Sequence, residues 1–429
     1  MTQTFFNMPC RICGSRRVEL FLDLGSQPHC NRLIPKEKLA AREPFYPLRV
    51  GFCHECTLVQ IDTTIPKEDM FSDYPYVSGT TKTLPSHFAD TSRRIIEAYK
   101  IAPGALVIDI GSNDGTWLKQ YEPFKMRVLG VEPATNVAEL AQLAGVPTLN
   151  RFFNEETADL IIANAGEADI VTAAGVFFHL EELHSVVRGI KKVLAPNGVF
   201  CVQAIYLGGM IENTAFDQVY HEHLCYYTLK SVSRLLGDHG LEVNNVSVVP
   251  VHGGTLELHV SHKGARAVQP TVADFAAQEK AKAFGEFETY QDFAKRTWAL
   301  KDSLIGVLKD FRRRGKRVYA YGAPAKGATL LNSFGITPDL VQLAVEKNPL
   351  KIGMAIPGCR IPIVDEASVD KPDAYLMLAW NFLTEFFRKE RPFLDEGGAF
   401  IVPIPDVRVI TKADLDAPST AVAAWGARV

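Results

Sequence analysis

The sequence predicts an α/β protein in which a small zinc-binding module precedes two doubly wound parallel sheets. Two Cys-x-x-Cys pairs lie within the first 56 residues. Farther along, the order of buried strand, glycine turn and helix begins at residue 105 and recurs at residue 316. Repeated units of this kind are typical of parallel sheets that carry helices on both faces.

The composition excludes several classes of protein. The 429 residues, of which 47% are hydrophobic and 22% charged, suit a globular chain of two or three domains. A net charge of −3 gives no reason to expect a nucleic-acid or anionic-membrane surface. No apolar run approaches the roughly 18 residues that span a bilayer, and the start, "MTQTFFNMPC", lacks the regions of a signal peptide. We therefore expect a cytoplasmic protein without nucleic-acid or membrane partners.

The cysteines are concentrated near the N-terminus. The chain has eight, and Cys10, Cys13, Cys53 and Cys56 form two Cys-x-x-Cys knuckles. In a cytosolic chain this pattern favours metal ligation over disulfides, and two knuckles supply four thiolates to a tetrahedral zinc. Four protein ligands leave no open position, so we expect a structural role for the zinc. His54, inside the second knuckle, is a weaker alternative ligand.

A connecting helix is predicted between the zinc module, expected at residues 1–75, and the first large sheet. It occupies the second half of the segment 76–100, where Ser86 is a suitable N-cap. The residues that give this segment its helical spacing are Phe88, Ile95, Ile96 and Tyr99.

The second block, expected at residues 76–262, begins with "GALVIDIGSNDGTWLKQY". A short buried strand, a turn from Gly111 to Gly115 and a helix are followed by the strand "MRVLGV" and then by Glu132. Glycines let the backbone approach a ligand closely, and an acidic residue after the second strand accepts hydrogen bonds from ribose hydroxyls. This order predicts a Rossmann-like, nucleoside-binding sheet.

The acidic residues of this turn indicate which nucleoside it binds. Asp109 precedes the turn, and Asn113 and Asp114 stand where a dinucleotide fold would hold its pyrophosphate. Two carboxylates disfavour a diphosphate and suit a cationic ligand without phosphate. S-adenosylmethionine fits, with Glu132 on its ribose, and we expect Gly111 among the residues that bind it. The alternative is a degenerate NAD fold.

Six separated motifs resemble the zinc-containing sugar C-methyltransferases. They are "DIGSNDG", "GVEPA", "YHEHLCYY", "HGGTL", "YGAPAKGATLLN" and "LAWNF". The resemblance runs nearly end to end, including both cysteine knuckles and "FSDYPYVSG". It implies methylation of C-3 of a nucleotide-linked 4-keto-deoxysugar in deoxysugar biosynthesis. The family's usual carrier is dTDP, with GDP and CDP as alternatives, and the C-terminal domain helps to hold the nucleotide sugar.

The third block, expected at residues 263–429, supports that last implication independently. After long helices over 265–316, "VYAYGAPAKGATLLNSF" again reads strand, glycine turn and helix, and Glu346 ends the next strand. This turn carries Lys326 and no carboxylate, and a helix N-terminus binds phosphate through its free N–H groups. We place the sugar nucleotide's diphosphate here, and the resemblance adds Gly327, His252 and Asn381 as substrate-binding residues.

Methylation of a carbon requires a base, donors facing an enolate oxygen and alignment of the two reactants. Histidine suits the base because its unperturbed pKa is about 6.5. The resemblance assigns the base to His223, with Glu222 and Tyr220 as supports. It places His179 beside the methyl donor, and Tyr76 in the active site with Tyr74 as a competitor.

Two features of the stretch around His223 remain open on sequence alone. If "VYHEHL" is extended, Tyr220 and Glu222 face one side while His221 and His223 face the other, which makes His221 the least suited to catalysis. "HEH" could instead bind a metal, but it lacks the H-E-x-x-H spacing and a third ligand.

Three residues depart from the family pattern, and two other functions stay open. Gly175, Phe178 and Cys30 stand where the family has other residue types, which leaves the exact sugar undetermined. An NAD-dependent sugar oxidoreductase would need a phosphate-compatible first turn. A non-catalytic zinc scaffold would be expected to have lost the base, yet His223 is present.

Overall fold

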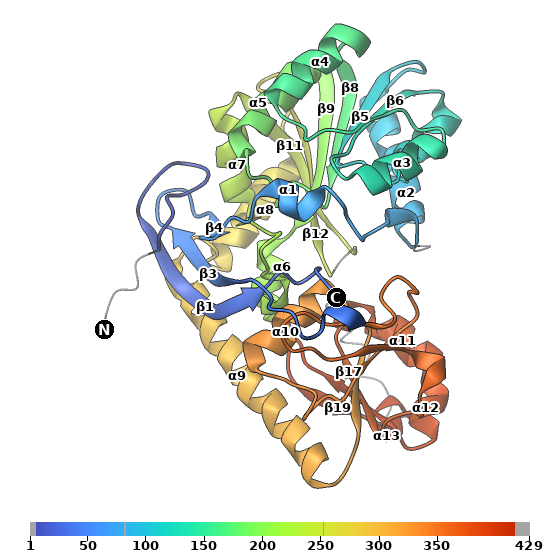
Figure 1. Ribbon diagram of the computed structural model, residues 1–429. Helices are drawn as coiled ribbons and strands as arrows, with labels where there is room; N and C mark the ends of the chain where they lie inside the picture. The colour runs from blue at the N-terminus through green and yellow to red at the C-terminus, as the bar shows by residue number, and fades with distance from the viewer. Residues whose placement is uncertain (1–5, 81–82, 252, 417–429) are drawn as a thin grey trace.

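The computed structural model describes residues 6–80, 83–251 and 253–416 and arranges them around a four-stranded, a seven-stranded and a six-stranded sheet (Figure 1). The predicted fold class, a small N-terminal module followed by two Rossmann-like sheets, is confirmed. In the described part of the chain, no helix is both long and apolar enough to cross a membrane.

The N-terminal module is an antiparallel sheet with the order β1-β3-β4-β10. Its first three strands are β1 (Val18–Pro28), β3 (Phe45–Cys53) and β4 (Val59–Ile61). The fourth, β10 (Cys225–Tyr226), comes from the middle of the chain and pairs with β4 through Cys225↔Gln60 and Tyr226↔Val59. The stretch that contains "YHEH" is therefore attached to the edge of the N-terminal module.

The central sheet has the order β11-β12-β9-β8-β5-β6-β7. Strands β5 to β9 run parallel, and β12 and β11 add an antiparallel edge. Because β6 and β8 lie on opposite sides of β5, the strand order reverses there, and ligands bind at such a point beyond the carboxyl ends. The strands are β5 (Leu106–Ile110), β6 (Arg127–Val131), β7 (Thr148–Leu149), β8 (Ala168–Ala174), β9 (Leu194–Ile205), β11 (Leu241–Val249) and β12 (Thr255–His262).

Alternating side chains of this sheet pack against helices on its two faces. Val107 belongs to the core beneath α2 (Thr83–Tyr99), whereas Ile108 belongs to the core beneath α5 (Leu183–Val193). The connecting helix is confirmed, but Ser86 as its N-cap is wrong because α2 begins at Thr83. Pro85 is tolerated there, since N–H groups in the first turn have no intrahelical partner.

The segment after the glycine turn also differs from the prediction. Instead of an α-helix, Leu118–Phe124 forms a 3-10 helix that contains Pro123 and ends at Lys125 in the left-handed region. Proline removes an N–H and clashes with the preceding turn, which prevents a longer α-helix. The central turn therefore presents no α-helix N-terminus to a ligand.

The C-terminal sheet has the order β16-β14-β13-β17-β18-β19 and is parallel except for β19. The predicted strand, turn and helix are β13 (Val318–Tyr321) and α10 (Ala325–Phe334). The predicted long helices between the sheets are α8 (Pro270–Ala281) and α9 (Phe287–Arg313). The other strands are β14 (Ala344–Glu346), β16 (Ile363–Asp365), β17 (Ala374–Met377), β18 (Ala399–Val402) and β19 (Arg408–Ile410).

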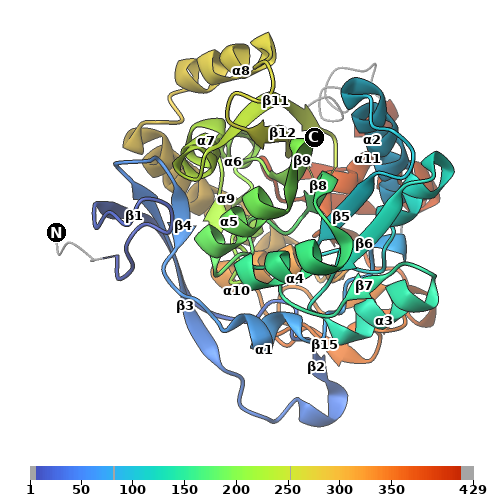
Figure 2. The same ribbon diagram turned by 90° about the horizontal axis from the view of Figure 1, so that it is seen from above.

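The N-terminal module lies against both large sheets, as Figures 1 and 2 show. On one side β10 joins it, and on the other β2 (Ile34–Pro35) pairs with β15 (Met354–Ala355) before β16. The remaining helices are α1 (Lys67–Phe71), α3 (Thr135–Leu143), α4 (Glu155–Ala165), α6 (Leu207–Asn213), α7 (Leu229–Asp238), α11 (Leu383–Lys389), α12 (Arg391–Asp395) and α13 (Lys412–Asp416). The module thus fixes the space between the two sheets.

The turn at Gly111 gives a test of this packing. Gly111 has φ +68°, and a Cβ there would clash with Val176, whereas Gly104 has φ +87° and nothing within 4 Å. Both Gly→Ala variants carry the left-handed strain of roughly 1–2 kcal/mol. Only Gly111→Ala adds a clash, worth about 1–3 kcal/mol, so it should lower the melting temperature more. Equal melting temperatures for the two variants would contradict the close contact with Val176.

Candidate active site

A cavity of about 860 Å³ lies where all three parts of the chain meet. The N-terminal module contributes Asn31, and residues 71–80, with Leu84 and Phe88, cover one side. The central sheet contributes the carboxyl ends of β5, β6, β8 and β9, and the C-terminal sheet contributes residues 324–326, 347–351 and 379–382. Its position at the strand reversal is that of a ligand site.

The nucleoside side of this cavity is built around Glu132. Its carboxylate is 6% exposed and accepts hydrogen bonds from the backbone N–H groups of Asn113 at 2.8 Å and Ala134 at 2.9 Å. Burial raises the pKa of Glu132 to about 6, opposed by these two bonds. Gly111, Asn113 and Glu132 all line the cavity, and the carboxylate has lone pairs left for ribose hydroxyls. The donor set fits an adenosyl ligand.

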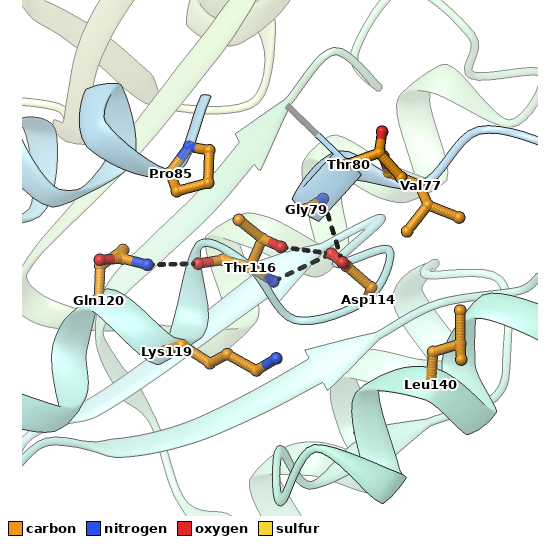
Figure 3. Close-up of a pocket in the computed structure, with 9 residues that line it drawn as sticks. All are labelled: Val77, Gly79, Thr80, Pro85, Asp114, Thr116, Lys119, Gln120 and Leu140. Atoms are coloured by element: carbon orange, nitrogen blue, oxygen red, sulfur yellow. Dashed lines mark hydrogen bonds between the residues drawn. The ribbon is translucent and has the colours of Figure 1, made fainter. Parts of the chain in front are cut away.

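The structure does not bring the carboxylates of Asp109 and Asp114 to this cavity. Asp109 lies beneath the turn, where Thr172 donates to it at 2.6 Å and burial raises its pKa to about 7. Asp114 faces a separate hollow of about 500 Å³ (Figure 3). There it accepts from the Gly79 N–H at 3.1 Å and from the Thr116 hydroxyl at 2.6 Å. Asp109 thus joins β5 to β8, and Asp114 joins the turn to its covering segment.

The segment that carries the two candidate tyrosines is tied to the same turn. The Asn113 side chain accepts from the Ser78 N–H at 2.9 Å and donates to the Tyr76 carbonyl at 2.9 Å. Tyr76 and Tyr74 both line the cavity, but the Tyr76 residue is 40% exposed. The Tyr74 hydroxyl instead donates to Glu222 at 3.0 Å. Tyr74 is therefore the tyrosine connected to the "YHEH" stretch.

The "YHEH" stretch is a turn, so the alternation expected of an extended chain is wrong. The His223 N–H donates to the Tyr220 carbonyl at 2.8 Å, which closes a turn over these residues. Tyr220 and His223 consequently face the cavity together, with ring centroids 3.7 Å apart. His221 points to the N-terminal module, where its Nε2 lies 3.1 Å from the Pro47 carbonyl. Its placement away from the cavity agrees with the weak case for its catalytic use.

The ring of His223 is held as a proton acceptor. Its Nδ1 lies 2.7 Å from the carbonyl of Gln218, which can only accept, so Nδ1 carries the proton and the lone pair is on Nε2. His179 stacks on this ring at 5.1 Å, and Phe178 packs edge-on at 4.5 Å. Burial lowers the pKa of His179 to about 3, and its buried Nε2 has no hydrogen-bond partner in the described structure. His179 is thus a neutral donor or acceptor beside the candidate base.

Glu222 is directed away from the cavity. It is 1% exposed and accepts from the Asn31 amide at 2.6 Å and from the Tyr74 hydroxyl. Burial raises the pKa of Glu222 to about 7, opposed by these two bonds. Cys30, one of the departures from the family pattern, lies beside it with Sγ 4.0 Å from the carboxylate. Glu222 therefore supports cavity-lining residues from behind.

The C-terminal side of the cavity is basic. Lys326, in the first turn of α10, has its Nζ 4.2 Å from the ring centre of Trp380 and hydrogen-bonded to Asn381. Burial lowers the pKa of Lys326 to about 8, opposed by the nearby carboxylate of Asp217. Such a partly desolvated ammonium gains much from a polyanionic ligand.

The other predicted substrate residues have different positions. Gly327 packs under Leu378, where a Cβ would approach within 2.8 Å, so its role is close packing of α10 on the sheet. Asn381 lines the cavity, whereas His252 lies outside the described residues.

Several cavity residues were not identified from the sequence. Lys347 and Lys351 follow β14 and line the same cavity as Lys326. Their signal was the basic "EKNPLK" directly after a buried strand. Gln203, in β9, is held by Glu257 at 2.7 Å and His87 at 3.1 Å. A polar residue near the carboxyl end of a buried strand was its signal.

The predicted metal ligands are brought together. The sulfur atoms of Cys10, Cys13, Cys53 and Cys56 all lie within 4.8 Å of one another. Tetrahedral zinc with bonds of about 2.3 Å requires sulfurs about 3.8 Å apart, so this cluster fits the ion. The weaker candidate, His54, pairs at 2.9 Å with Glu19 and is outside the cluster.

Comparison with known proteins agrees with this layout. Three family models match in succession: a putative zinc binding domain at residues 10–71, a methyltransferase domain at 86–246 and a C-methyltransferase C-terminal domain at 250–405. The C-methyltransferase NovU of Streptomyces niveus is 35% identical over 405 residues, which covers 94% of this chain and 96% of NovU.

Solved structures resemble less than half of the chain. The magnesium protoporphyrin IX methyltransferase of Synechocystis PCC 6803 covers 41% of this chain and 79% of its own, with 14% identity and a TM-score of 0.32. An S-adenosylmethionine-dependent methyltransferase of Clostridium acetobutylicum covers 43% and 94%, with 11% identity and a TM-score of 0.33. A likeness this distant supports no statement about substrate.

Zinc removal gives a test of the metal cluster. Metal analysis of the purified protein should give about one zinc per chain. Cys53→Ser removes a ligand, so it should abolish zinc retention and lower the melting temperature. Cys359→Ser is the matched control, because Cys359 is outside the cluster, and this variant should keep its zinc. The zinc site would be refuted if the purified wild-type protein contained no zinc and if added zinc left its melting temperature unchanged.

Proposed function

This chain belongs to the family of zinc-containing, S-adenosylmethionine-dependent C-methyltransferases, and we propose that it methylates C-3 of a nucleotide-linked 4-keto-deoxysugar. The observation that carries the proposal is that side chains suited to a ribose, to a proton transfer and to a phosphate all line one cavity. Glu132 suits a ribose, His223 suits proton abstraction and Lys326 suits phosphate, and all line the same space. A sugar joined to a diphosphate would reach from the lysine to the histidine.

The basic wall supports a diphosphate-linked substrate. Lys326 is in the first turn of α10, whose first turn has no acidic residue, so free N–H groups and the helix dipole favour an anion there. Lys347 and Lys351 line the same wall. Burial lowers the pKa of Lys351, as it does for Lys326, and a bound diphosphate would raise the pKa of both ammonium groups. The carrier nucleotide is proposed to be dTDP.

The residues near His223 support a proton-transfer step. Gln218 holds the ring so that Nε2 can take the C-3 proton, and the C–H electron pair then passes to the 4-keto oxygen as an enolate. Burial raises the pKa of Tyr220 well above the ordinary value, so this phenol stays protonated and can donate to that oxygen, whereas the Tyr74 hydroxyl donates its proton to Glu222. S-adenosylmethionine, when bound, supplies an electrophilic methyl group on a sulfonium.

The methyl transfer balances without a further reactant. The enolate carbon forms the new C–C bond as the methyl–sulfur bond breaks, and the sulfur retains the electron pair. The ketone re-forms, and the proton remains on His223 until solvent removes it. The neutral ring of His179, stacked on His223, imposes no cationic repulsion on the imidazolium.

The alternative, an NAD-dependent sugar oxidoreductase, has less support. A dinucleotide needs an α-helix N-terminus after the first glycine turn to hold its pyrophosphate. That position has a 3-10 helix, Leu118–Phe124, and Asp114 stands in the turn. The phosphate-compatible turn is instead in the C-terminal sheet, at Lys326.

The substrate proposal is tested with a labelled methyl donor and dTDP-, GDP- and CDP-linked 4-keto-deoxysugars. We expect methyl transfer to C-3 with the dTDP sugar. His223→Asn should reduce kcat by about 10²–10⁴-fold, as expected for loss of a general base, with unchanged binding of S-adenosylhomocysteine. His221→Asn is the control and should retain turnover, because His221 faces Pro47. Full turnover by His223→Asn would overturn the assignment of the base.

Lys326→Met tests the phosphate position. Loss of a charged hydrogen-bond donor costs about 1.5–3 kcal/mol, so the KM for the sugar nucleotide should rise by roughly 10- to 100-fold. Calorimetry should show weaker dTDP binding with unchanged binding of S-adenosylhomocysteine. Lys119→Met is the matched control, since Lys119 lines the separate hollow of Figure 3. Unchanged dTDP binding by Lys326→Met would place the diphosphate elsewhere.

A further inference from the structure

We propose that Asn31, delivered by the zinc module, is a positioning residue of the active site that acts through Glu222. The proposal rests on the function proposed above. Asn31 lines the large cavity, and its Nδ2 donates to one oxygen of the Glu222 carboxylate at 2.6 Å. The Tyr74 hydroxyl donates to the other oxygen at 3.0 Å. One buried carboxylate therefore holds two cavity-lining side chains.

The charged groups around Glu222 show that these two donors are needed to stabilise its carboxylate. Among the ion pairs of the described residues, its only partner is His29, with Nε2 at 3.6 Å. Burial, together with repulsion from His221 and Arg32, lowers the pKa of His29 to about 4, so His29 is neutral and supplies no positive charge. The other titratable groups that face this carboxylate are Cys30, Tyr74 and Tyr220. Burial raises the pKa of each, so none supplies a positive charge.

Neutral hydrogen-bond donors must therefore stabilise the anion of Glu222. Bonds from a neutral donor to a carboxylate are short and strong because the acceptor is charged. The bond from Asn31 is the shorter of the two that Glu222 accepts. Without it, the buried carboxylate would hold its proton more tightly, and the Tyr74 hydroxyl would lose its anionic acceptor.

The zinc module determines where Asn31 stands. The loop that carries it follows directly after β1, whose last residue, Pro28, pairs with Phe45 of β3. Within the loop, the Arg32 N–H donates to the His29 carbonyl at 3.1 Å. On the other side, β10 joins β4 just beyond Glu222. The donor and the acceptor are thus both fixed by the sheet that holds the cysteine cluster.

The pH dependence of turnover tests this role. The acid limb of the kcat profile reflects both the base, His223, and Glu222, whose anion holds the side chains of Asn31 and Tyr74. Asn31→Ala removes a donor to the anion and should move that limb upward by about one pH unit. Asn31→Asp is nearly isosteric and places a second carboxyl group against Glu222, so it should move the limb further. Binding of S-adenosylhomocysteine and zinc content should be unchanged, which shows that both variants fold.

A double-mutant cycle separates action through Glu222 from a merely structural role. In a Glu222→Gln background, Asn31→Ala should leave the acid limb where the single Glu222→Gln variant has it. A shift of equal size in both backgrounds would overturn the proposal. An unshifted limb in Asn31→Ala, or loss of zinc from both Asn31 variants, would overturn it as well.

A second measurement does not need turnover and so separates this proposal from the substrate assignment. Folding raises the pKa of Glu222 from 4.5 to about 7, so its contribution to stability is complete below about pH 4.5 and is lost as pH rises through about 7. The higher pKa in Asn31→Ala extends that loss to higher pH. Between pH 6 and 8 the melting temperature of Asn31→Ala should change differently from that of wild type, and Glu222→Gln should abolish the difference.

The two outcomes are distinguishable. If no keto-sugar nucleotide is methylated but the melting temperatures diverge as described, the substrate proposal fails and the coupling of Asn31 to Glu222 stands. If wild type is active and the melting-temperature curves of wild type and Asn31→Ala run parallel, the coupling fails alone.

Discussion

The pairing of β10 with β4 is the interaction on which the rest of the active site depends. It makes Cys225–Tyr226 an edge strand of the sheet that carries the cysteine cluster. The residues just before that strand therefore have a fixed position relative to the N-terminal module. A catalytic turn in a free loop would lose much of its alignment to conformational entropy. Here the backbone ladder and the metal cluster remove that freedom in advance.

A second constraint follows from how the turn sorts its side chains. The Tyr220–His223 turn places these two rings on the cavity and directs His221 and Glu222 to the N-terminal module. In an extended strand, alternate residues would share a face, so Tyr220 would lie with Glu222 and His221 with His223. The turn thus separates His223, the proposed base, from Glu222, which holds Asn31 and Tyr74. The same separation explains why Glu222, though adjacent in sequence to His223, hydrogen-bonds Asn31 and Tyr74.

Local patterns were sufficient for the fold but not for the site. Buried strands, glycine turns and cysteine spacing depend on neighbouring residues, and they identified the three sheets and the ligands of the cluster. The role of Glu222 could not be derived in that way, because its partner Asn31 is 191 positions away. The contact of Asp114 could not be derived either, because Gly79 lies on a different segment. The 3-10 helix after the turn differs from these two cases, because Pro123 is a local signal in the sequence against a long α-helix.

The distribution of charge along the cavity suits the proposed reaction. The carboxyl group of Glu132, the ammonium of Lys326 and the stacked rings of His179 and His223 all line this cavity. In the proposed reaction, an enolate attacking a sulfonium would cancel two opposite charges, so the transition state would be less polar than the reactants. Desolvation of the two reactants strengthens that attraction. A diphosphate bound at Lys326, as proposed, would be held by its own cation and would not compete for the sulfonium.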